Sequence, residues 1–463
     1  MIQSARLKVL VDVPPRTPAR YVLYWMQQSQ RAEFNPALEY ALEQANDLDL
    51  PLVVCFGLTA FPEANARHYG FMLDGLAEVR RRLEARGVAF VIRKAPPQDL
   101  TRALAVDAAL VVCDRGYLKI QRTWRAKLAE SLAQGDIRRL VQVEGDVVVP
   151  VERVSDHHEY AARTLRPKLH RIWDDFLEPL AARPVRRRAD SLSLADLPGA
   201  PVDLDDVPGV LAGLKIDQTV GPVRRFPAGE GAARAALDTF IDRSLARYGA
   251  ERGKPESGVA SLMSPYLHFG QISPVEIALA ARRTPASDSR ASYIEELIVR
   301  RELAMNHCFY APDYDRYDAM PEWARKTLAD HAGDDRPYLY GREQFEAAAT
   351  HDPYWNAAMR EMRSTGYMHN YLRMYWGKKV LHWSRSPEEA FETTLALNNR
   401  WFLDGRDANS FTNVGWLYGL HDRPWGPQPV FGTVRSMGPN TFKKFDADAY
   451  VRLVARMEAD ERG

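Results

Sequence analysis

The sequence of 463 residues is poor in cysteine, contains no long apolar run and carries almost no net charge. Cys55, Cys113 and Cys308 form no CxxC pair and have no metal-ligand spacing, so neither a disulfide framework nor a metal site is predicted, and a reducing compartment is indicated. No apolar run approaches the ~18 residues that cross a membrane, and the start MIQSARLKVL lacks the apolar region of a signal peptide. We therefore expect an intracellular, cytoplasmic protein without a membrane partner.

The net charge of +1 neither indicates nor excludes a nucleic-acid partner, because a local basic patch can bind DNA on a neutral protein. The length exceeds what one ordinary core needs, so two or three domains are expected.

The sequence of residues 1–180 predicts an α/β domain. Short β-rich runs alternate with amphipathic stretches, and several runs are continuously apolar, as in strands covered on both faces. This order predicts a Rossmann-like, doubly wound parallel sheet with right-handed crossovers. The expected strands are Tyr21–Met26, Leu52–Phe56, Val88–Ile92, Leu110–Cys113 and Val147–Val149, and the expected helices lie near 36–46, 68–86, 98–105 and 119–134.

The sequence after the first expected strand reads QQSQR over residues 27–31. It contains neither GxGxxG nor GxxxxGK[ST], so no dinucleotide or nucleoside triphosphate bound in the usual way is predicted. Another planar ligand beyond the strand ends and a purely structural role both remain open.

Residues 181–228 predict a surface connection between domains, because six prolines interrupt any long element. The triplet Arg186–Arg188 could contact DNA phosphates or form an ordinary solvated charge run.

Residues 229–463 predict an all-α domain. Seven of the ten tryptophans lie there, interleaved with Arg and Lys. That mixture suits the stacking of planar groups and the binding of phosphates, although a Trp-rich core would use many of the same positions. Helices are expected near 230–247, 274–283, 290–308, 342–349, 353–365, 367–383, 387–400 and 446–458.

The stretch 351–383 predicts two helices joined near Gly366. Trp376 and Trp383 are seven residues apart, which places them on one helix face at about 10 Å along the axis. Both could be core residues, or they could belong to a chain of redox-active aromatics that leads to a buried cofactor.

Four further segments carry candidate site residues. SGVASLMSPYLHFG, residues 257–270, places hydroxyls before a helix start, where they could hold a phosphate or merely cap the helix. EELIVRRE, residues 295–302, predicts an i,i+4 pair of Glu296 with Arg300. NNRWFLDGRD, residues 398–407, ends a helix in a polar turn. WLYGLHDRPW contains His421 and Asp422 without a nucleophile, so no hydrolase is predicted.

Taken in order, these segments resemble the photolyase–cryptochrome family, and in detail the class II cyclobutane pyrimidine dimer photolyases. The resemblance implies an α/β domain that can hold an antenna chromophore, a folate or a deazaflavin, and a helical domain that holds a U-shaped FAD. The matching segments span nearly the whole chain: YWMQQSQR, SLMSPYLHFGQISP, EELIVRREL, HDPYWNA, MHNYLRMYWGKKVLHW, LNNRWFLDGRD and KKFDADAY.

The resemblance also implies roles for individual residues around FAD. Asn398 is expected to approach flavin N5, and Arg373 is expected to face Asp404 beside the flavin ring. The residues expected to contact the cofactor are Tyr248, Ser261, Leu262, Ser264, Asn370, Arg373 and Asp404.

Two further groups of residues follow from the same resemblance. Glu296 is expected to hydrogen-bond the damaged base, in a pocket lined by Met374 and Trp416. Electrons are expected to reach photoexcited oxidised flavin through Trp376, Trp355 and Trp383.

Some positions discriminate within the family or depart from its pattern. Class I members carry Trp where Arg300 stands, which favours class II. The segment after Gly405 differs from the class II sequence pattern and leaves the roles of Asn409 and Asn413 open. The segment Gly432–Asn440 also differs from that pattern.

The implied function is light-driven repair of UV-damaged DNA by a monomeric carbon–carbon lyase. An electron passes from photoexcited FADH⁻ to a flipped-out cyclobutane pyrimidine dimer, the ring splits, and the electron returns. One alternative is a cryptochrome-like photoreceptor, which usually carries a long C-terminal extension that is not expected here. A (6-4) photolyase is disfavoured, because the motifs have the class II sequence pattern. A further alternative is a nucleotide-binding or structural protein whose tryptophans are only core residues.

Overall fold

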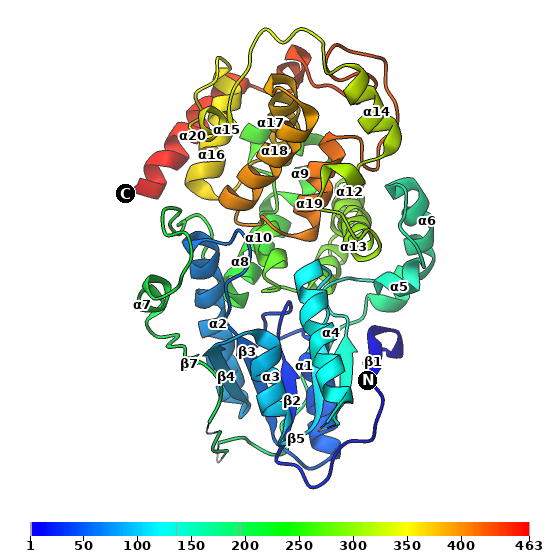
Figure 1. Cartoon of the computed structure of the whole chain (residues 1–463), viewed down its shortest axis with the longest axis vertical. Helices are drawn as coiled ribbons and strands as arrows, with labels where there is room; N and C mark the ends of the chain where they lie inside the picture. The colour runs from blue at the N-terminus through cyan, green and yellow to red at the C-terminus, as the bar shows by residue number, and fades with distance from the viewer. Residues whose placement is uncertain (1, 136, 191, 195, 463) are drawn as a thin grey trace.

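The computed structural model describes residues 2–135, 137–190, 192–194 and 196–462, with a sheet-containing half and a helical half stacked along the long axis (Figure 1). The first half holds a seven-stranded sheet in the order β1-β6-β5-β2-β3-β4-β7. Five central strands run parallel, and the two edge strands, β1 and β7, pair antiparallel. The strands are β1 (Leu7–Val11), β2 (Tyr21–Trp25), β3 (Leu52–Gly57), β4 (Ala89–Lys94), β5 (Ala108–Asp114), β6 (Arg139–Val143) and β7 (Ala200–Pro201).

Helices cover both faces of this sheet. Val22 and Tyr24 point to one face and share a core with α1 and α2, whereas Leu23 and Trp25 point to the other and share a core with α3 and α4. The predicted doubly wound α/β fold is therefore confirmed. The helices of this half are α1 (Pro36–Asp47), α2 (Ala66–Arg86), α3 (Pro97–Ala105), α4 (Lys119–Ala133) and α7 (Val207–Ala212). The helices α5 (Val151–Val154) and α6 (Ala162–Ile172) follow β6 but lie beside the helical half, where Leu165 and Leu169 share a core with Leu237 and Ile277 (Figure 1).

The strand predicted at Val147–Val149 is wrong. The sixth strand, β6, ends at Val143, and residues 147–149 are irregular although fully buried. Their backbone groups bond to side chains instead of a neighbouring strand: Arg6 Nη2 donates to the Val148 carbonyl at 2.7 Å, and Val148 N donates to Glu302 Oε1 at 2.5 Å. The backbone groups of the apolar run therefore bond to two ionisable side chains, Arg6 and Glu302, that are distant in sequence.

The connection at 181–228 follows the surface of the sheet half and contributes its edge strand β7 and the short helix α7 (Figure 1). Arg187 pairs with Asp49 at 3.0 Å and Arg188 with Asp190 at 2.6 Å, all four side chains being more than half exposed. The Arg triplet is thus a solvated charge run with local partners.

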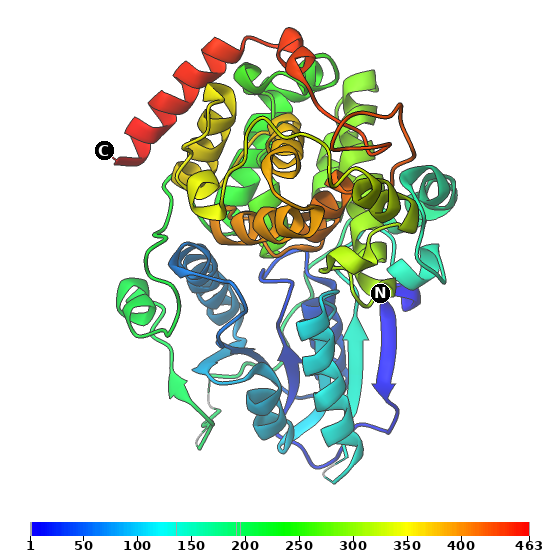
Figure 2. The ribbon, with the colours of Figure 1, turned by 45° about the horizontal axis from the view of Figure 1, so that its top comes forward.

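After residue 229 the described chain is helical, as predicted. The helix predicted over 290–308 is divided by a π-helical segment, Glu295–Arg300, between α12 and α13, and α20 packs along α16 (Figure 2). None of the described helices is both long and apolar enough to cross a membrane. The helices are α8 (Glu230–Arg243), α9 (Leu245–Glu251), α10 (Ser264–His268), α11 (Pro274–Arg282), α12 (Asp288–Ile294), α13 (Arg301–Tyr310), α14 (Glu322–Asp330), α15 (Arg342–Glu346), α16 (Pro353–Thr365), α17 (Asn370–Trp383), α18 (Pro387–Trp401), α19 (Ala408–Leu417) and α20 (Ala447–Arg462).

The N-terminus of α2 joins the two halves. The buried Arg67 donates from Nη1 to the Trp401 carbonyl at 2.6 Å and from Nη2 to the Arg363 carbonyl at 2.6 Å, which are end carbonyls of α18 and α16. Beside it, His68 Nδ1 accepts from Asn65 N, so Nε2 carries the proton and donates to the Phe402 carbonyl at 2.9 Å. A cation at two helix C-termini satisfies carbonyls that have no intrahelical partner and interacts favourably with both helix dipoles.

We expect Arg67→Met to lower the free energy of unfolding by about 3 kcal/mol or more, because hydrogen bonds to a charged group contribute ~1.5–3 kcal/mol each. Urea unfolding followed by Trp fluorescence measures the change. The control is Arg20→Met, whose exposed pair with Asp107 should cost less than about 1 kcal/mol. Equal unfolding midpoints for the two variants would contradict the role assigned to Arg67.

Candidate functional site

A large cavity opens in the helical half, with about 1790 Å³ of empty space including the part open to solvent. Its walls come from α9, the segment before α10, the π-helical segment, the start of α17, the loop after α18, and α19. Ten of the fourteen predicted site residues line it. These are Tyr248, Ser261, Leu262, Ser264, Asn370, Arg373 and Asp404, predicted to contact a cofactor, and Glu296, Met374 and Trp416, predicted to contact a substrate.

An ion pair between Arg373 and Asp404 forms one wall. Arg373 Nη1 and Nη2 donate to Asp404 Oδ1 and Oδ2 at 3.1 and 3.0 Å, and its Nε donates to the Met368 carbonyl at 2.9 Å. The guanidinium also lies 3.9 Å from the centre of the Phe402 ring. A bidentate pair with all edges engaged fixes orientation as well as charge, so α17 and the loop after α18 are held in one geometry.

The segment before α10 shapes the opposite wall. Leu262 has a φ of +58°, a left-handed conformation that is uncommon for a residue with a side chain. Strained backbone of this kind is frequent at ligand-binding sites. Ser261 and Ser264 flank it and place two hydroxyls at the cavity.

His369, the N-cap of α17, adds a neutral donor to the same cavity. Burial, and then the charges of Arg373 and Arg252, lower its pKa to about 4. Its Nδ1 accepts from Tyr371 N at 3.3 Å, so the proton lies on Nε2.

Glu296 pairs with a different residue from the one predicted. Its Oε1 accepts from Arg252 Nη2 at 2.6 Å, while Arg300 lies 3.4 Å from Glu295. The predicted Glu296–Arg300 pair is wrong because this segment is π-helical, and a π-helix brings residues i and i+5 into register instead of i and i+4.

Arg252 was missed from the sequence. It donates to Glu296 and, from Nη1, to Ser292 Oγ at 2.9 Å, and it lies 5.6 Å from the Tyr248 ring. Arg252 stands four residues after Tyr248 and so lies on the same helical face. This spacing could have indicated that Arg252 lies near the cavity. Asn409 and Asn413, whose roles the sequence left open, also line the cavity.

Asn398 lies outside the cavity lining, buried in the last turn of α18. Its Nδ2 donates to Asn399 Oδ1 at 3.0 Å, and that oxygen also accepts from Arg406 N at 3.0 Å. The side chain is therefore tied to the loop that carries Asp404. Its predicted contact with a cofactor remains a prediction.

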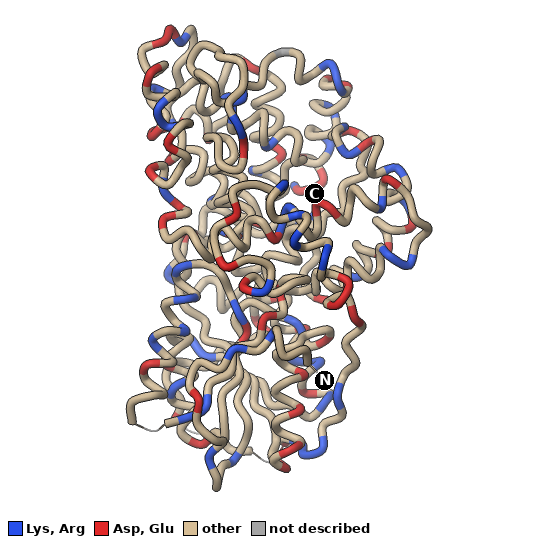
Figure 3. The backbone as a smooth tube through the Cα atoms, turned by 90° about the vertical axis from the view of Figure 1, so that its right-hand side faces the viewer, with Lys and Arg blue, Asp and Glu red and all other residues tan. Residues whose placement is uncertain are grey.

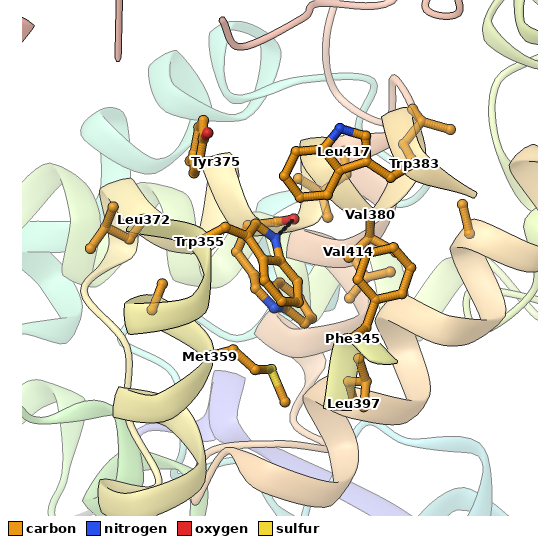
Figure 4. Packing of buried hydrophobic residues seen from close by; sticks show 14 of the residues in the cluster. Phe345, Trp355, Met359, Leu372, Tyr375, Val380, Trp383, Leu397, Val414 and Leu417 are labelled. Atoms are coloured by element: carbon orange, nitrogen blue, oxygen red, sulfur yellow. Dashed lines mark hydrogen bonds between the residues drawn. The ribbon is translucent and has the colours of Figure 1, made fainter. Parts of the chain in front are cut away.

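The three other predicted residues form a buried stack beneath the cavity. Trp355 and Trp376 lie nearly parallel, with ring centres 6.5 Å apart. The ring centres of Trp355 and Trp383 are 6.1 Å apart (Figure 4). Trp355 Nε1 donates to the Trp376 carbonyl at 3.0 Å. As the two-turn spacing predicted, Trp376 and Trp383 face the same way, and both contact Trp355 of α16.

The stack connects the cavity wall with the surface. Trp376 lies 6.3 Å from Phe402, the ring beneath Arg373. At the other end, Trp383 lies 4.9 Å from His351, which stacks on the exposed Tyr338 at 3.6 Å.

A second cavity of about 990 Å³ lies between the carboxyl ends of β2 and β3 and the helical half. His268 and Asp407 line both cavities and are 3.3 Å apart. Burial alone would raise the pKa of Asp407, but the hydrogen bond and charge of His268, the charge of Arg301 and the hydrogen bond from Asn409 N together outweigh burial and lower the pKa to about 2. The ionised carboxylate of Asp407 thus lies between the first and the second cavity.

The backbone after β2 explains why no nucleotide motif occurs there. Asp114, at the end of β5, accepts from Gln27 N, Gln28 N and Ser29 N at 3.0, 3.1 and 2.7 Å. Successive backbone N–H groups at a strand end can bind a phosphate in a nucleotide-binding fold. In this chain an internal carboxylate occupies that position.

Comparisons with known proteins agree on one family. Residues 22–185 match the family model described as DNA photolyase. The chain is 44% identical to a deoxyribodipyrimidine photo-lyase of Methanothermobacter thermautotrophicus over 453 residues, which cover 97% of this chain and 98% of the relative.

Two solved structures are similar in fold. A class III photolyase from Agrobacterium tumefaciens superposes with a TM-score of 0.73 at 21% identity, covering 95% of this chain and 87% of that one. An archaeal photolyase from Sulfolobus tokodaii, described with two FAD molecules, gives 0.68 at 16% identity, covering 95% and 93%.

Asp404→Asn should lower the free energy of unfolding by about 3 kcal/mol, because it leaves the Arg373 cation, only 15% exposed, without its partner. Asp107→Asn, in the exposed pair with Arg20, is the matched control and should cost less than about 1 kcal/mol. Chemical unfolding of both variants measures the difference. A cost for Asp404→Asn as small as that of the control would show that the pair does not hold this wall.

Proposed function

The chain belongs to the DNA photolyase family, and from this membership we propose that it is a deoxyribodipyrimidine photo-lyase, an enzyme that uses light to split cyclobutane pyrimidine dimers in UV-damaged DNA. The observation that carries the proposal is the cavity of the helical half, which is lined by ten of the fourteen residues predicted from the family resemblance and lies near three buried tryptophans. Identity of 44% to a named relative along nearly the whole chain supports it independently.

The cavity lining suits FAD. Hydroxyls of Ser261 and Ser264 and amides of Asn370 and Asn409 offer neutral donors for phosphates and riboses, and Leu262 with Tyr248 offers apolar surface. When bound in its reduced form, FAD would supply the light-excited electron. The protein's part is to hold the ring system against the Arg373–Asp404 pair and to keep water away from it.

The substrate side of the cavity has the composition that a flipped pyrimidine dimer requires. Met374 and Trp416 give apolar and stacking surface, and Glu296 is the polar anchor. Arg300, which also lines the cavity, lies 5.4 Å from the centre of the Trp416 ring and stabilises its position by a cation–π contact. Extrusion of a base costs a few kcal/mol, and less at a damaged step, so part of the selectivity comes from the DNA itself.

Damaged DNA would approach over the loop that follows α19. Trp425 in this loop is 39% exposed, and Arg423 and Arg435 lie 5.2 and 4.9 Å from its ring. An exposed aromatic flanked by cations suits contact with unstacked bases and phosphates. Acidic and basic residues are interspersed along the backbone (Figure 3). Binding through the local basic patch around Trp425 would weaken with salt.

Several finer assignments belong to the same proposal. The second cavity would hold an antenna chromophore, a deazaflavin or a folate, because it is largely apolar and shares His268 and Asp407 with the first. The sequence around Arg300 supports membership of the class II photolyases. We also propose a monomeric, intracellular, cytoplasmic enzyme with an antenna-type domain at 1–180, a linker at 181–228 and an FAD-binding domain at 229–463. The end of the family match at residue 185 supports the first boundary.

Glu296→Ala should reduce light-driven repair about fivefold or more while flavin content is retained, because one hydrogen bond of ~1 kcal/mol to the damaged base is lost. Repair is measured as loss of dimers from an oligonucleotide at saturating DNA. Glu322→Ala is the control, since Glu322 is exposed at the start of α14 and lies outside the cavity lining. Unchanged repair by Glu296→Ala would reject its role.

Trp376→Phe should slow light-driven reduction of the bound flavin sharply, because Trp376 is the member of the stack beside Phe402 and the cavity wall. Repair by chemically prereduced protein should persist. Absorbance during illumination measures the reduction, and Trp323→Phe, in α14 and outside the stack, is the control. Normal photoreduction in Trp376→Phe would break the proposed chain.

A further inference from the structure

Three histidines that are far apart in sequence meet at the junction of the two halves. His158 lies in the loop between α5 and α6, His307 on α13, and His421 in the turn after α19. Their ring centres form a nearly equal-sided triangle with edges of 4.9, 5.6 and 5.5 Å. One nitrogen from each ring lies within 4.8 Å of the others. The cluster, hereafter the histidine triad, belongs to neither of the two cavities.

The backbone around the triad is fixed from α13. The Asn306 side chain accepts from Glu159 N at 2.7 Å and donates to the His157 carbonyl at 3.0 Å, so it holds the peptide groups on both sides of His158. Tyr310 also donates to the Ser155 carbonyl at 2.6 Å. Ligand side chains carried on restrained backbone are the requirement for a geometrically defined site.

The hydrogen bonds determine which ring nitrogens are free. His421 Nδ1 lies 2.8 Å from the Tyr160 carbonyl, which can only accept, so Nδ1 carries the proton and Nε2 presents a lone pair. That Nε2 is buried and has no hydrogen-bond partner in the part of the chain that the structure describes. A ring N–H donated to a backbone carbonyl is the usual outer contact that orients a metal-bound histidine.

His307 and His158 supply the other two nitrogens. His307 Nδ1 and His158 Nε2 are 3.0 Å apart. Two imidazole nitrogens on one zinc ion, each at ~2.0–2.1 Å from it, lie about 3.3 Å from one another, so a small outward movement would admit the ion. Burial lowers the pKa of His307 to about 2 and that of His421 to about 4, and it lowers the pKa of His158 as well. All three rings are thus neutral at pH 7, the form that coordinates metals.

We propose that His158, His307 and His421 bind one divalent transition-metal ion of the zinc type, with a fourth position open to solvent beside His158, the most exposed of the three. Three neutral imidazoles favour zinc, cobalt or nickel over magnesium or calcium, which prefer oxygen ligands. Arg300 is the cation whose charge acts on His421 and would repel a metal ion, and Glu295, 3.4 Å from its Nε, offsets this charge. The ion would tie the loop at 155–161 to α13 and to the turn that follows the cavity residue Trp416.

The test uses the untagged, full-length protein with its flavin, first treated with a chelator and then equilibrated with Zn²⁺ and desalted. Metal content is measured by mass spectrometry, and affinity by competition with a zinc indicator. The variants are His421→Asn, because Asn tolerates the left-handed φ of +56° at this position, and His158→Gln. His157→Gln, in the same loop and outside the triad, is the matched control.

Wild-type and His157→Gln protein should retain one Zn²⁺ per chain and unfold at a higher temperature with the ion than without it. In both triad variants affinity should fall by at least about tenfold and the thermal shift should disappear. The proposal is overturned if wild-type protein retains no zinc, if the triad variants retain as much as wild type, or if His157→Gln loses it equally. Should His421→Asn fail to fold, His158→Gln decides, since its side chain is the least buried.

Discussion

The capping of two helix ends by one buried arginine is the contact on which the geometry of the cavity depends. Arg67, at the start of α2, holds the last carbonyls of α16 and α18 together with His68. The loop that begins at Phe402 is therefore anchored to the sheet half at its first residue. It then carries Asp404 to Arg373. Asn398, in the last turn of α18, and the turn at Gly366 that leads into α17 adjoin these same two helix ends. The sheet half thus serves as the support from which the helical cavity is positioned.

Three arginines that line the cavity each lie beside a carboxylate. Arg252, Arg373 and Arg300 each have an acidic neighbour, Glu296, Asp404 and Glu295, at 2.6, 3.0 and 3.4 Å. Paired cations of this kind can bind an anionic ligand or exchange partners at modest cost, because the new anionic partner replaces the old one. The pair of Arg252 with Glu296, at 34% and 29% exposed, is more accessible than the pair of Arg373 with Asp404, at 15% and 8%, so substrate can rearrange it more easily.

Periodicity and family motifs predicted much of this structure. Continuously apolar runs correctly indicated the central strands, because strands buried on both faces need no polar positions. The two-turn spacing of Trp376 and Trp383 correctly indicated a shared face. Matching segments identified the residues that line the cavity, although several of these lie more than a hundred residues apart.

The failures have physical causes that local sequence does not express. Val147–Val149 is as apolar as a strand, but its backbone groups are satisfied by Arg6 and Glu302. The pairing of Glu296 changed because a π-helical turn shifts the register by one residue. The histidine triad could not be predicted, since no spacing rule connects three residues brought together by the packing of the two halves.

The most direct measurement is the illumination of a dimer-containing oligonucleotide with reduced wild-type protein, with dimers counted by chromatography in light and in darkness. The account predicts loss of dimers in the light, restoration of intact pyrimidines, and no loss in darkness. Flavin-loaded, reduced protein that leaves the dimers intact under light would contradict it and would favour a light-sensing role for the same cavity.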